Sequence, residues 1–273
     1  MESCNLKALL QGLRKRFHSF DFVRIGESFG QPIVLIQPQN FDPALPNILI
    51  ASGTHGEELG GPWGILEWAR KNEPILAGVN LSILPVVNPA AFVAGIRYNP
   101  AGETSNDGFG SGVLSTEGQV LWSHRYTLRF FAQDGFLSLH ENAWRDKFFF
   151  YLDARRGSTE GLPEALRSVP DGKILQLPDG EWQSPHEGTY LVEDGIVWGD
   201  GKVDGTLERW LLNQGTPVAV VPEIPILGTP FEDRVVAHSR VIEAFLDWIR
   251  KAHVSNRVAR TWIFGGSRKN PMG

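Results

Sequence analysis

Two side chains that can bind a metal, His55 and Glu58, lie three positions apart in the segment Ala51-Ser-Gly-Thr-His-Gly-Glu-Glu58. They follow the apolar run 47–50, which predicts a strand that ends in a glycine turn, and they precede a helix expected from about residue 62. A strand-to-helix turn lets both side chains point to one side, where an imidazole nitrogen and a carboxylate bind zinc together. The spacing therefore predicts part of a metal site.

A third candidate ligand, His140, ends another strand-like run at residues 135–139. Two ligands from one loop and one from a distant strand leave the fourth zinc position open for water, as a catalytic site requires. The one cysteine of the sequence, Cys4, excludes a zinc site built from thiolates, so histidines and carboxylates have to hold any metal.

Glu223 follows the strand-like run 217–221. In open parallel sheets, active sites collect where strands end. A carboxylate there can take a proton from metal-bound water and pass it to a departing amine. Taken alone, Glu223 is more typical of a surface carboxylate, but its place after the two histidine segments favours a catalytic role.

Alternating strands and helices must position these residues. Further strand-like runs occupy residues 33–36, 81–87 and 148–152, and helices are expected at about 116–132 and 232–251. This alternation predicts an α/β fold, a three-layer α/β/α sandwich with a central mixed, mostly parallel sheet. We expect residues 1–273 to form one domain with a loop-rich excursion at about 153–215, where glycine and proline are frequent.

The composition narrows the class of protein. A net charge of −5 and a pI near 5.8 argue against binding to nucleic acid. No apolar run is long enough to span a membrane, and the N-terminus lacks the apolar core of a signal peptide. With a single cysteine, these features favour a cytoplasmic globular protein.

The order of the motifs resembles the zinc carboxypeptidase superfamily, which includes succinylglutamate desuccinylases, aspartoacylases and compact bacterial enzymes that cleave murein peptides. The resemblance covers roughly residues 47–249. It depends on four segments, namely Gly53-Thr-His-Gly-Glu-Glu58, Asn88-Pro-Ala-Ala-Phe-Val-Ala-Gly-Ile-Arg97, Ser138-Leu-His-Glu141 and Glu223-Ile-Pro225.

The resemblance implies a role for each matching residue. It implies one zinc ion bound by His55, Glu58 and His140. It also implies that Arg97 polarises the scissile carbonyl and that Glu223 is the general base. Asn106 would hydrogen-bond the substrate. A second metal at Glu57 and Glu141, together with Asp107, is not expected, because neighbouring residues of an extended segment point apart.

One departure from the family bears on the substrate. Asp107 stands where carboxypeptidases have an arginine that docks the terminal carboxylate of the substrate, and an anion there repels such a group. Three interpretations stay open at this substrate-binding position. Another cation (Arg145, Arg155 or Arg156) binds the substrate carboxylate in place of the arginine, the substrate offers an amine at this position, or the carboxypeptidase activity is lost.

The sequence thus predicts a zinc-dependent hydrolase of an amide bond in a small peptide. The first alternative is a desuccinylase or aspartoacylase-like enzyme that acts on an N-acyl amino acid. The second, from another class, is a non-catalytic peptide-binding protein on the same scaffold, which Asp107 suggests. The sequence makes no prediction of the oligomeric state.

Overall fold

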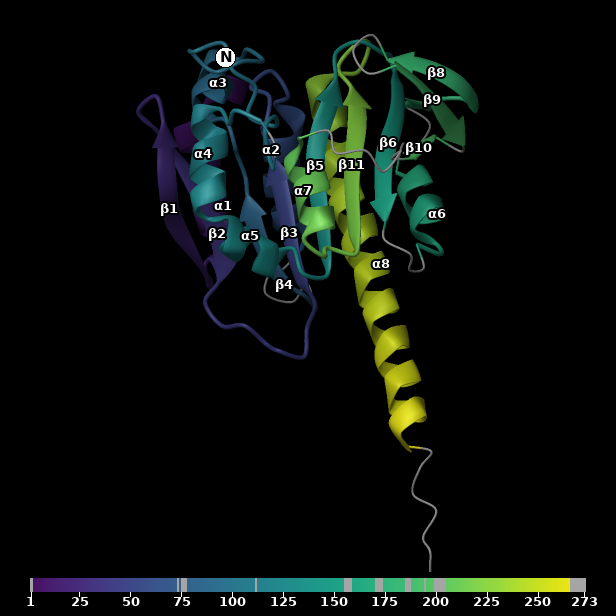
Figure 1. Cartoon of the computed structure of the whole chain (residues 1–273). Helices are drawn as coiled ribbons and strands as arrows, with labels where there is room; N and C mark the ends of the chain where they lie inside the picture. The colour runs from purple at the N-terminus through teal and green to yellow at the C-terminus, as the bar shows by residue number, and fades with distance from the viewer. Residues whose placement is uncertain are drawn as a thin grey trace, which may run out of the picture.

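A single mixed sheet with helices on both faces organises the chain (Figure 1). The computed structural model describes residues 2–72, 74, 78–110, 112–154, 159–169, 174–184, 188–193, 195–198 and 205–265. The strands are β1 (Phe20–Ser28), β2 (Gln31–Pro38), β3 (Asn47–Ser52), β4 (Asn80–Leu84), β5 (Gly135–Asn142), β6 (Lys147–Ala154), β7 (Leu175–Gln176), β8 (Gly180–Ser184), β9 (Gly188–Glu193), β10 (Ile196–Trp198) and β11 (Val218–Pro225). The helices are η1 (Glu2–Cys4), α1 (Leu6–Arg16), α2 (Gly60–Lys71), α3 (Pro89–Ala94), α4 (Thr116–Ser123), α5 (Arg125–Phe131), α6 (Leu162–Arg167), α7 (Leu207–Asn213) and α8 (Phe231–Gly265).

The strand order is β1-β2-β4-β3-β5-β11-β6-β10-β9-β8. The four central strands β4, β3, β5 and β11 are parallel to one another, whereas β1 and β2 on one side and β6 on the other run antiparallel to their inner neighbours. The fold class expected from the sequence is confirmed. Because the central strands run the same way, the residues after β3, β5 and β11 meet at one edge of the sheet, towards which the arrowheads of β5 and β11 point in Figure 1.

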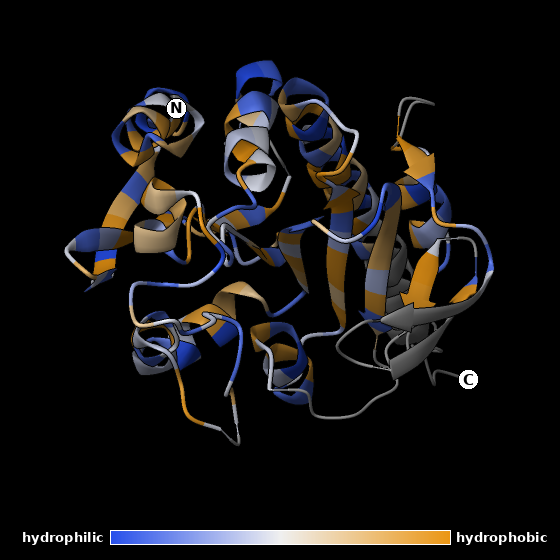
Figure 2. Cartoon of the chain, turned by 90° about the horizontal axis from the view of Figure 1, so that it is seen from above, coloured by the Kyte–Doolittle hydropathy of each residue, from blue (hydrophilic) through white to orange (hydrophobic). Residues whose placement is uncertain are grey.

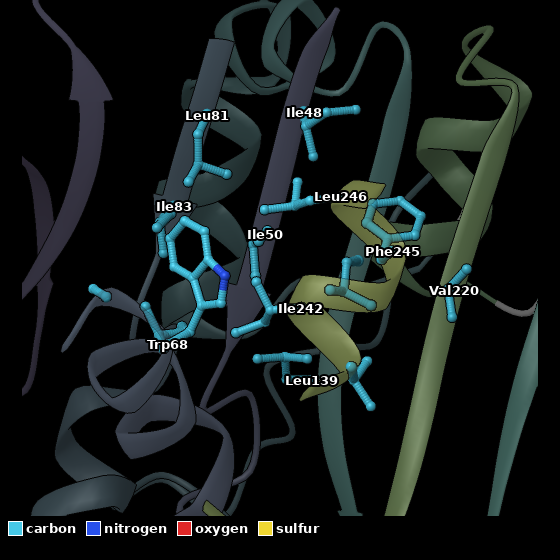
Figure 3. Packing of buried hydrophobic residues seen from close by; sticks show 14 of the residues in the cluster. Ile48, Ile50, Trp68, Leu81, Ile83, Leu139, Val220, Ile242, Phe245 and Leu246 are labelled. Carbon is cyan, nitrogen blue, oxygen red and sulfur yellow. The ribbon is translucent and has the colours of Figure 1, made fainter. Parts of the chain in front are cut away.

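Alternating side chains of the central strands build a core on each face. Ile48 and Ile50 of β3 belong to the cluster with α1, α2 and α8, whereas Leu49 and Ala51 belong to the cluster with α5 and α7. Figure 3 shows Ile242, Phe245 and Leu246 of α8 facing β3, β5 and β11. Seen from above, the apolar strands lie between two layers of helices (Figure 2). This burial on both faces explains why the central strands are continuous apolar runs.

Three elements differ from the sequence prediction. β1 was not predicted, because it is an edge strand whose middle residues are mostly exposed or half-buried. The helix expected at 116–132 is broken at His124, whose N–H bonds to the carbonyls of Leu121 and Trp122 and whose Nε2 lies 2.9 Å from the carbonyl of Ile25. α8 continues to Gly265, beyond the expected end at 251, and extends past the sheet in Figure 1.

The predicted excursion at 153–215 is partly regular. Where it is described, it forms α6, β7–β10 and α7, and β10, β9 and β8 extend the sheet beyond β6. In the described part of the chain, no helix is both long and apolar enough to cross a membrane.

Candidate active site

The loop between β3 and α2 depends on two glycines. Gly53 has a φ of 61°, which favours glycine, and its carbonyl accepts a hydrogen bond from Asn88 N. A Cβ at Gly56 would lie 2.1 Å from the carbonyl carbon of Ala91, because the loop passes directly over the end of α3. Gly56 N also donates to the carbonyl of Arg97 at 3.4 Å. These contacts fix the loop that carries His55 and Glu58 and bring it next to Arg97.

The asparagine-proline segment before Arg97 is a short helix with two defined ends. The side chain of Asn88 caps α3 by accepting from Ala91 N at 3.1 Å, and Pro89 occupies the first turn. Gly95 ends the helix with a φ of 67°. The motif therefore determines where the chain turns and how Arg97 reaches the loop of His55.

His55, Glu58 and His140 converge at the edge of the sheet. Nδ1 of His55 lies 2.6 Å from Oε1 of Glu58, and Nδ1 of His140 lies 3.1 Å from Oε2 of the same carboxylate. One ligand atom from each residue falls within 4.8 Å of the others, and all three residues are buried. The two imidazole rings meet edge to face, with centroids 5.2 Å apart. The arrangement offers two nitrogens and a carboxylate to one cation.

The charges of this group stabilise one another. Burial acts to raise the pKa of Glu58, but the adjacent His55 and His140 outweigh it and hold that pKa well below its ordinary value. Burial acts to lower the pKa of His140, but the Glu58 carboxylate, with help from Glu208, raises that pKa well above its ordinary value. Glu58 is therefore ionised at neutral pH, as a metal ligand has to be.

Glu223 lies beside this group. It is the register partner of His140 between the parallel strands β11 and β5, and its charge contributes to the raised pKa of His140. Its side chain is half-buried. The structure thus brings Glu223 next to the candidate metal ligands, at the end of the neighbouring strand.

Arg97 lies beside Glu58 and is partly exposed. Its Nη1 donates to Oε1 of Glu57 at 3.1 Å and lies 3.6 Å from Oε1 of Glu58, and 33% of its side chain is exposed. One end of the guanidinium is held by carboxylates while the side chain keeps access to solvent. This position suits a group that meets a bound molecule.

Glu57 and Glu141, the residues considered for a second metal, have partners of their own. Glu57 binds Arg97, as described above. Glu141 Oε2 accepts from Gly60 N at 3.0 Å and lies 2.7 Å from Nη1 of Arg234 on α8. Within the described residues, only His55, Glu58 and His140 form a group of three that meets the metal-ligand distances.

Asn106 and Asp107 lie in the loop after α3. Oδ1 of Asn106 accepts from Leu207 N at 3.2 Å, so this oxygen holds the start of α7. Asp107 is exposed. Of the cations named as substitutes for the missing arginine, Arg145 is half-buried just after β5, and its backbone N–H donates to Oδ1 of Asn142 at 3.1 Å. Arg155 and Arg156 lie outside the described residues.

Glu208 on α7 also lies against the site, although no sequence pattern indicates it. Its Oε1 lies 3.6 Å from Nε2 of His140, and its side chain is 7% exposed. The neighbouring His140, with help from the hydroxyl of Ser138, outweighs the effect of burial and lowers the pKa of Glu208 to about 2. In the sequence, Glu208 follows the helix cap Thr206, where a carboxylate is typical of an exposed first turn. That pattern carries no sign of burial.

The family model of the succinylglutamate desuccinylase/aspartoacylase catalytic domain matches residues 44–133, the segment that contains His55, Glu58 and Arg97. A predicted aspartoacylase from Prochlorococcus marinus (strain MIT 9301) is 39% identical over 51 residues, a match that spans 19% of this chain and only 17% of that relative.

Solved structures extend the similarity to nearly the whole chain. A predicted metallopeptidase from Shewanella denitrificans OS217 is 30% identical with a TM-score of 0.80, over 89% of this chain and 90% of that one. A metallo-carboxypeptidase from Burkholderia cenocepacia is 16% identical with a TM-score of 0.64, over 92% of this chain and 68% of that one, and so shares the fold.

The fold and the relatives together identify a hydrolase of the zinc carboxypeptidase-like type, and the chain belongs to that superfamily. Within that superfamily it matches the branch of the succinylglutamate desuccinylases and aspartoacylases.

Proposed function

We propose that the protein is a zinc-dependent hydrolase that cleaves an amide bond in a small peptide. The observation that carries the proposal is the convergence of His55, Glu58 and His140, with Glu223 in register with His140. Two imidazoles and a carboxylate with one open coordination position are the ligand set of catalytic zinc sites in hydrolases.

The residues present fit such an ion. Glu58 Oε2 is buried and has no hydrogen bond that satisfies it, although Nδ1 of His140 lies 3.1 Å away. A buried carboxylate with an unsatisfied oxygen is costly unless a cation completes it. We therefore assign one zinc ion to this group, with one ligand atom from each of the three side chains. When bound, zinc polarises a carbonyl and lowers the pKa of a bound water.

The remaining chemistry belongs to Arg97 and Glu223. The guanidinium of Arg97 hydrogen-bonds the oxygen of the scissile carbonyl and stabilises the negative charge that develops there as water attacks the carbon. The carboxylate of Glu223 takes the proton from the attacking water. It then gives that proton to the departing nitrogen, so that the C–N bond breaks and an amine and a carboxylate leave.

Asp107 modifies the substrate expectation. An exposed carboxylate in the substrate-binding loop disfavours a peptide whose terminal carboxylate binds there, and it favours a group that carries an amine. A peptide that contains a diamino acid meets this condition. Arg145 is the described cation that would instead bind a carboxylate from the side of β5.

A second candidate function is hydrolysis of an N-acyl amino acid. The match of residues 44–133 to the succinylglutamate desuccinylase/aspartoacylase catalytic domain favours it. Both candidates use the same metal ligands and the same base, and they differ in the groups that flank the amide.

A substrate panel on the zinc-loaded protein tests the proposal. The panel contains peptides with a free terminal carboxylate, peptides with a diamino acid, N-succinylglutamate and N-acetylaspartate. We expect turnover of a peptide, strongest where it offers an amine, and we expect Glu223→Gln to reduce kcat by about 10²- to 10⁴-fold with zinc still bound.

Each alternative has its own outcome. Turnover of the acyl amino acids alone would favour the second candidate. Stoichiometric zinc without turnover of any amide would favour a non-catalytic binding protein. Wild-type activity in Glu223→Gln would refute the assignment of the base.

A further inference from the structure

The ring of His140 lies between two buried carboxylates. Its Nδ1 is 3.1 Å from Oε2 of Glu58, inside the candidate metal group, whereas its Nε2 is 3.6 Å from Oε1 of Glu208 and 3.1 Å from Oγ of Ser138. Only one ring nitrogen can bind a given ion, and the other carries the proton that fixes the tautomer. Nδ1 faces the metal group, so Nε2 has to be the donor.

Glu208 has no evident reason of its own to be buried. It occupies the first turn of α7, where a carboxylate can point to solvent, yet its side chain is 7% exposed and its Oε2 has no hydrogen bond. Burial of a carboxylate costs free energy unless a partner compensates it. The partners that the structure provides are the imidazole of His140 and the hydroxyl of Ser138.

We propose that Glu208 is a positioning residue for the metal site, and that it orients the ring of His140 through Nε2. Ser138 completes the contact, since its hydroxyl accepts from Nε2–H and donates to the carboxylate of Glu208. A histidine that binds a metal through one nitrogen and a carboxylate through the other is held in one orientation and becomes a more basic ligand. The proposal rests on the zinc site proposed above.

The start of α7 is anchored so that Glu208 reaches the site. Leu207 N donates to Oδ1 of Asn106, and Arg209 N donates to Oγ1 of Thr206, both at 3.2 Å. Phe109 N donates to the carbonyl of Gly205 at 2.7 Å. The loop that carries Asn106 thereby sets the position of α7, and through Glu208 it sets the position of His140.

Zinc affinity is the measurement that tests this role, because it does not require a substrate. We would remove the metal with a chelator and measure zinc binding by competition with a chromophoric chelator. We expect Glu208→Gln to weaken zinc binding by about 10- to 100-fold, the usual effect of losing such a partner. Its Co²⁺-substituted form should also show a changed visible spectrum, because the orientation of His140 changes.

Glu243→Gln is the matched control. Glu243 is a half-buried carboxylate that accepts from Nε1 of Trp68 at 2.7 Å, between α2 and α8, and takes no part in the metal group. We expect zinc affinity and the Co²⁺ spectrum of this variant to match those of the wild type.

Unchanged zinc affinity and an unchanged Co²⁺ spectrum in folded Glu208→Gln would overturn the proposal. If Glu208→Gln does not fold, Ser138→Ala provides the test instead. The contact of Ser138 with His140 and Glu208 predicts weaker zinc binding in this variant too, and an unchanged zinc affinity would overturn the proposal. Zinc binding without hydrolysis of any amide would refute the proposed function while the comparison of affinities still tests Glu208. A wild-type protein that binds no zinc would refute both.

Discussion

Arg234→Met tests whether a buried ion pair holds the metal-binding loop to the rest of the fold. Arg234 on α8 lies 2.7 Å from Glu141, whose side chain is fully buried, and the same carboxylate accepts from Gly60 N at the start of α2. Removal of the arginine leaves a buried carboxylate with a single backbone donor and with Nε2 of His238 at 3.7 Å.

The expected cost follows from these contacts. Removal of one partner from a buried ion pair destabilises a protein by about 3–5 kcal/mol. The lower end, about 3 kcal/mol, applies because Gly60 N still donates to the carboxylate. At about 2–4 °C per kcal/mol for a chain of this size, the midpoint of thermal unfolding should fall by about 6–12 °C.

Two further variants make the assay specific. Lys71→Met removes the exposed pair between Lys71 and Glu67, in which the lysine side chain is 55% exposed, and it should cost about 0–1 kcal/mol. The double variant Arg234→Met/Glu141→Gln should recover much of the loss, because a neutral amide can still accept from Gly60 N.

Thermal and denaturant unfolding of the metal-free proteins measure these differences. A loss below about 1 kcal/mol in Arg234→Met, or a double variant no more stable than the single one, would refute the reasoning.

Two other predictions concern the metal site. Gly56→Ala places a Cβ 2.1 Å from the backbone of Ala91, so the loop that carries His55 and Glu58 has to move, and zinc affinity should fall by about tenfold or more. Gly118→Ala inside α4 is the control and should leave zinc affinity unchanged. Equal zinc affinities of the two variants would contradict the close approach of Gly56 to Ala91. The metal-free protein should lose stability as the pH rises above 6.5. The pKa of His140 is higher in the folded protein than its value of 6.5 in the unfolded chain, so protonated His140 stabilises the fold at low pH, and this contribution disappears as the proton leaves. The effect of Glu58 has the opposite sign. Its pKa is lowered from 4.5 in the folded protein, so its contribution to stability is lost as the pH falls below 4.5. Scanning fluorimetry of chelator-treated and zinc-loaded protein between pH 4 and 9 would reveal both effects, and a flat profile in the metal-free form would exclude them.

The sequence by itself determined the local features of the protein. Continuous apolar runs predicted the central strands, because a parallel strand covered on both faces has no polar side. The glycine turn and the spacing of His55 and Glu58 placed both side chains in one loop. His140 and Glu223 were expected where their strands end, and β5 and β11 in fact continue through them to Asn142 and Pro225. The apolar pattern did not predict β1, because an edge strand needs no apolar face along its whole length.

The tertiary structure alone decided which of these segments meet. β11 is inserted between β5 and β6, which puts Glu223 in register with His140, and no local pattern encodes that strand order. Asn106 proved to hold α7, and Glu208 proved to be buried against His140, because both contacts join segments far apart in the chain. Side-chain chemistry and spacing are local properties of the sequence, whereas burial and partnership depend on how distant elements pack.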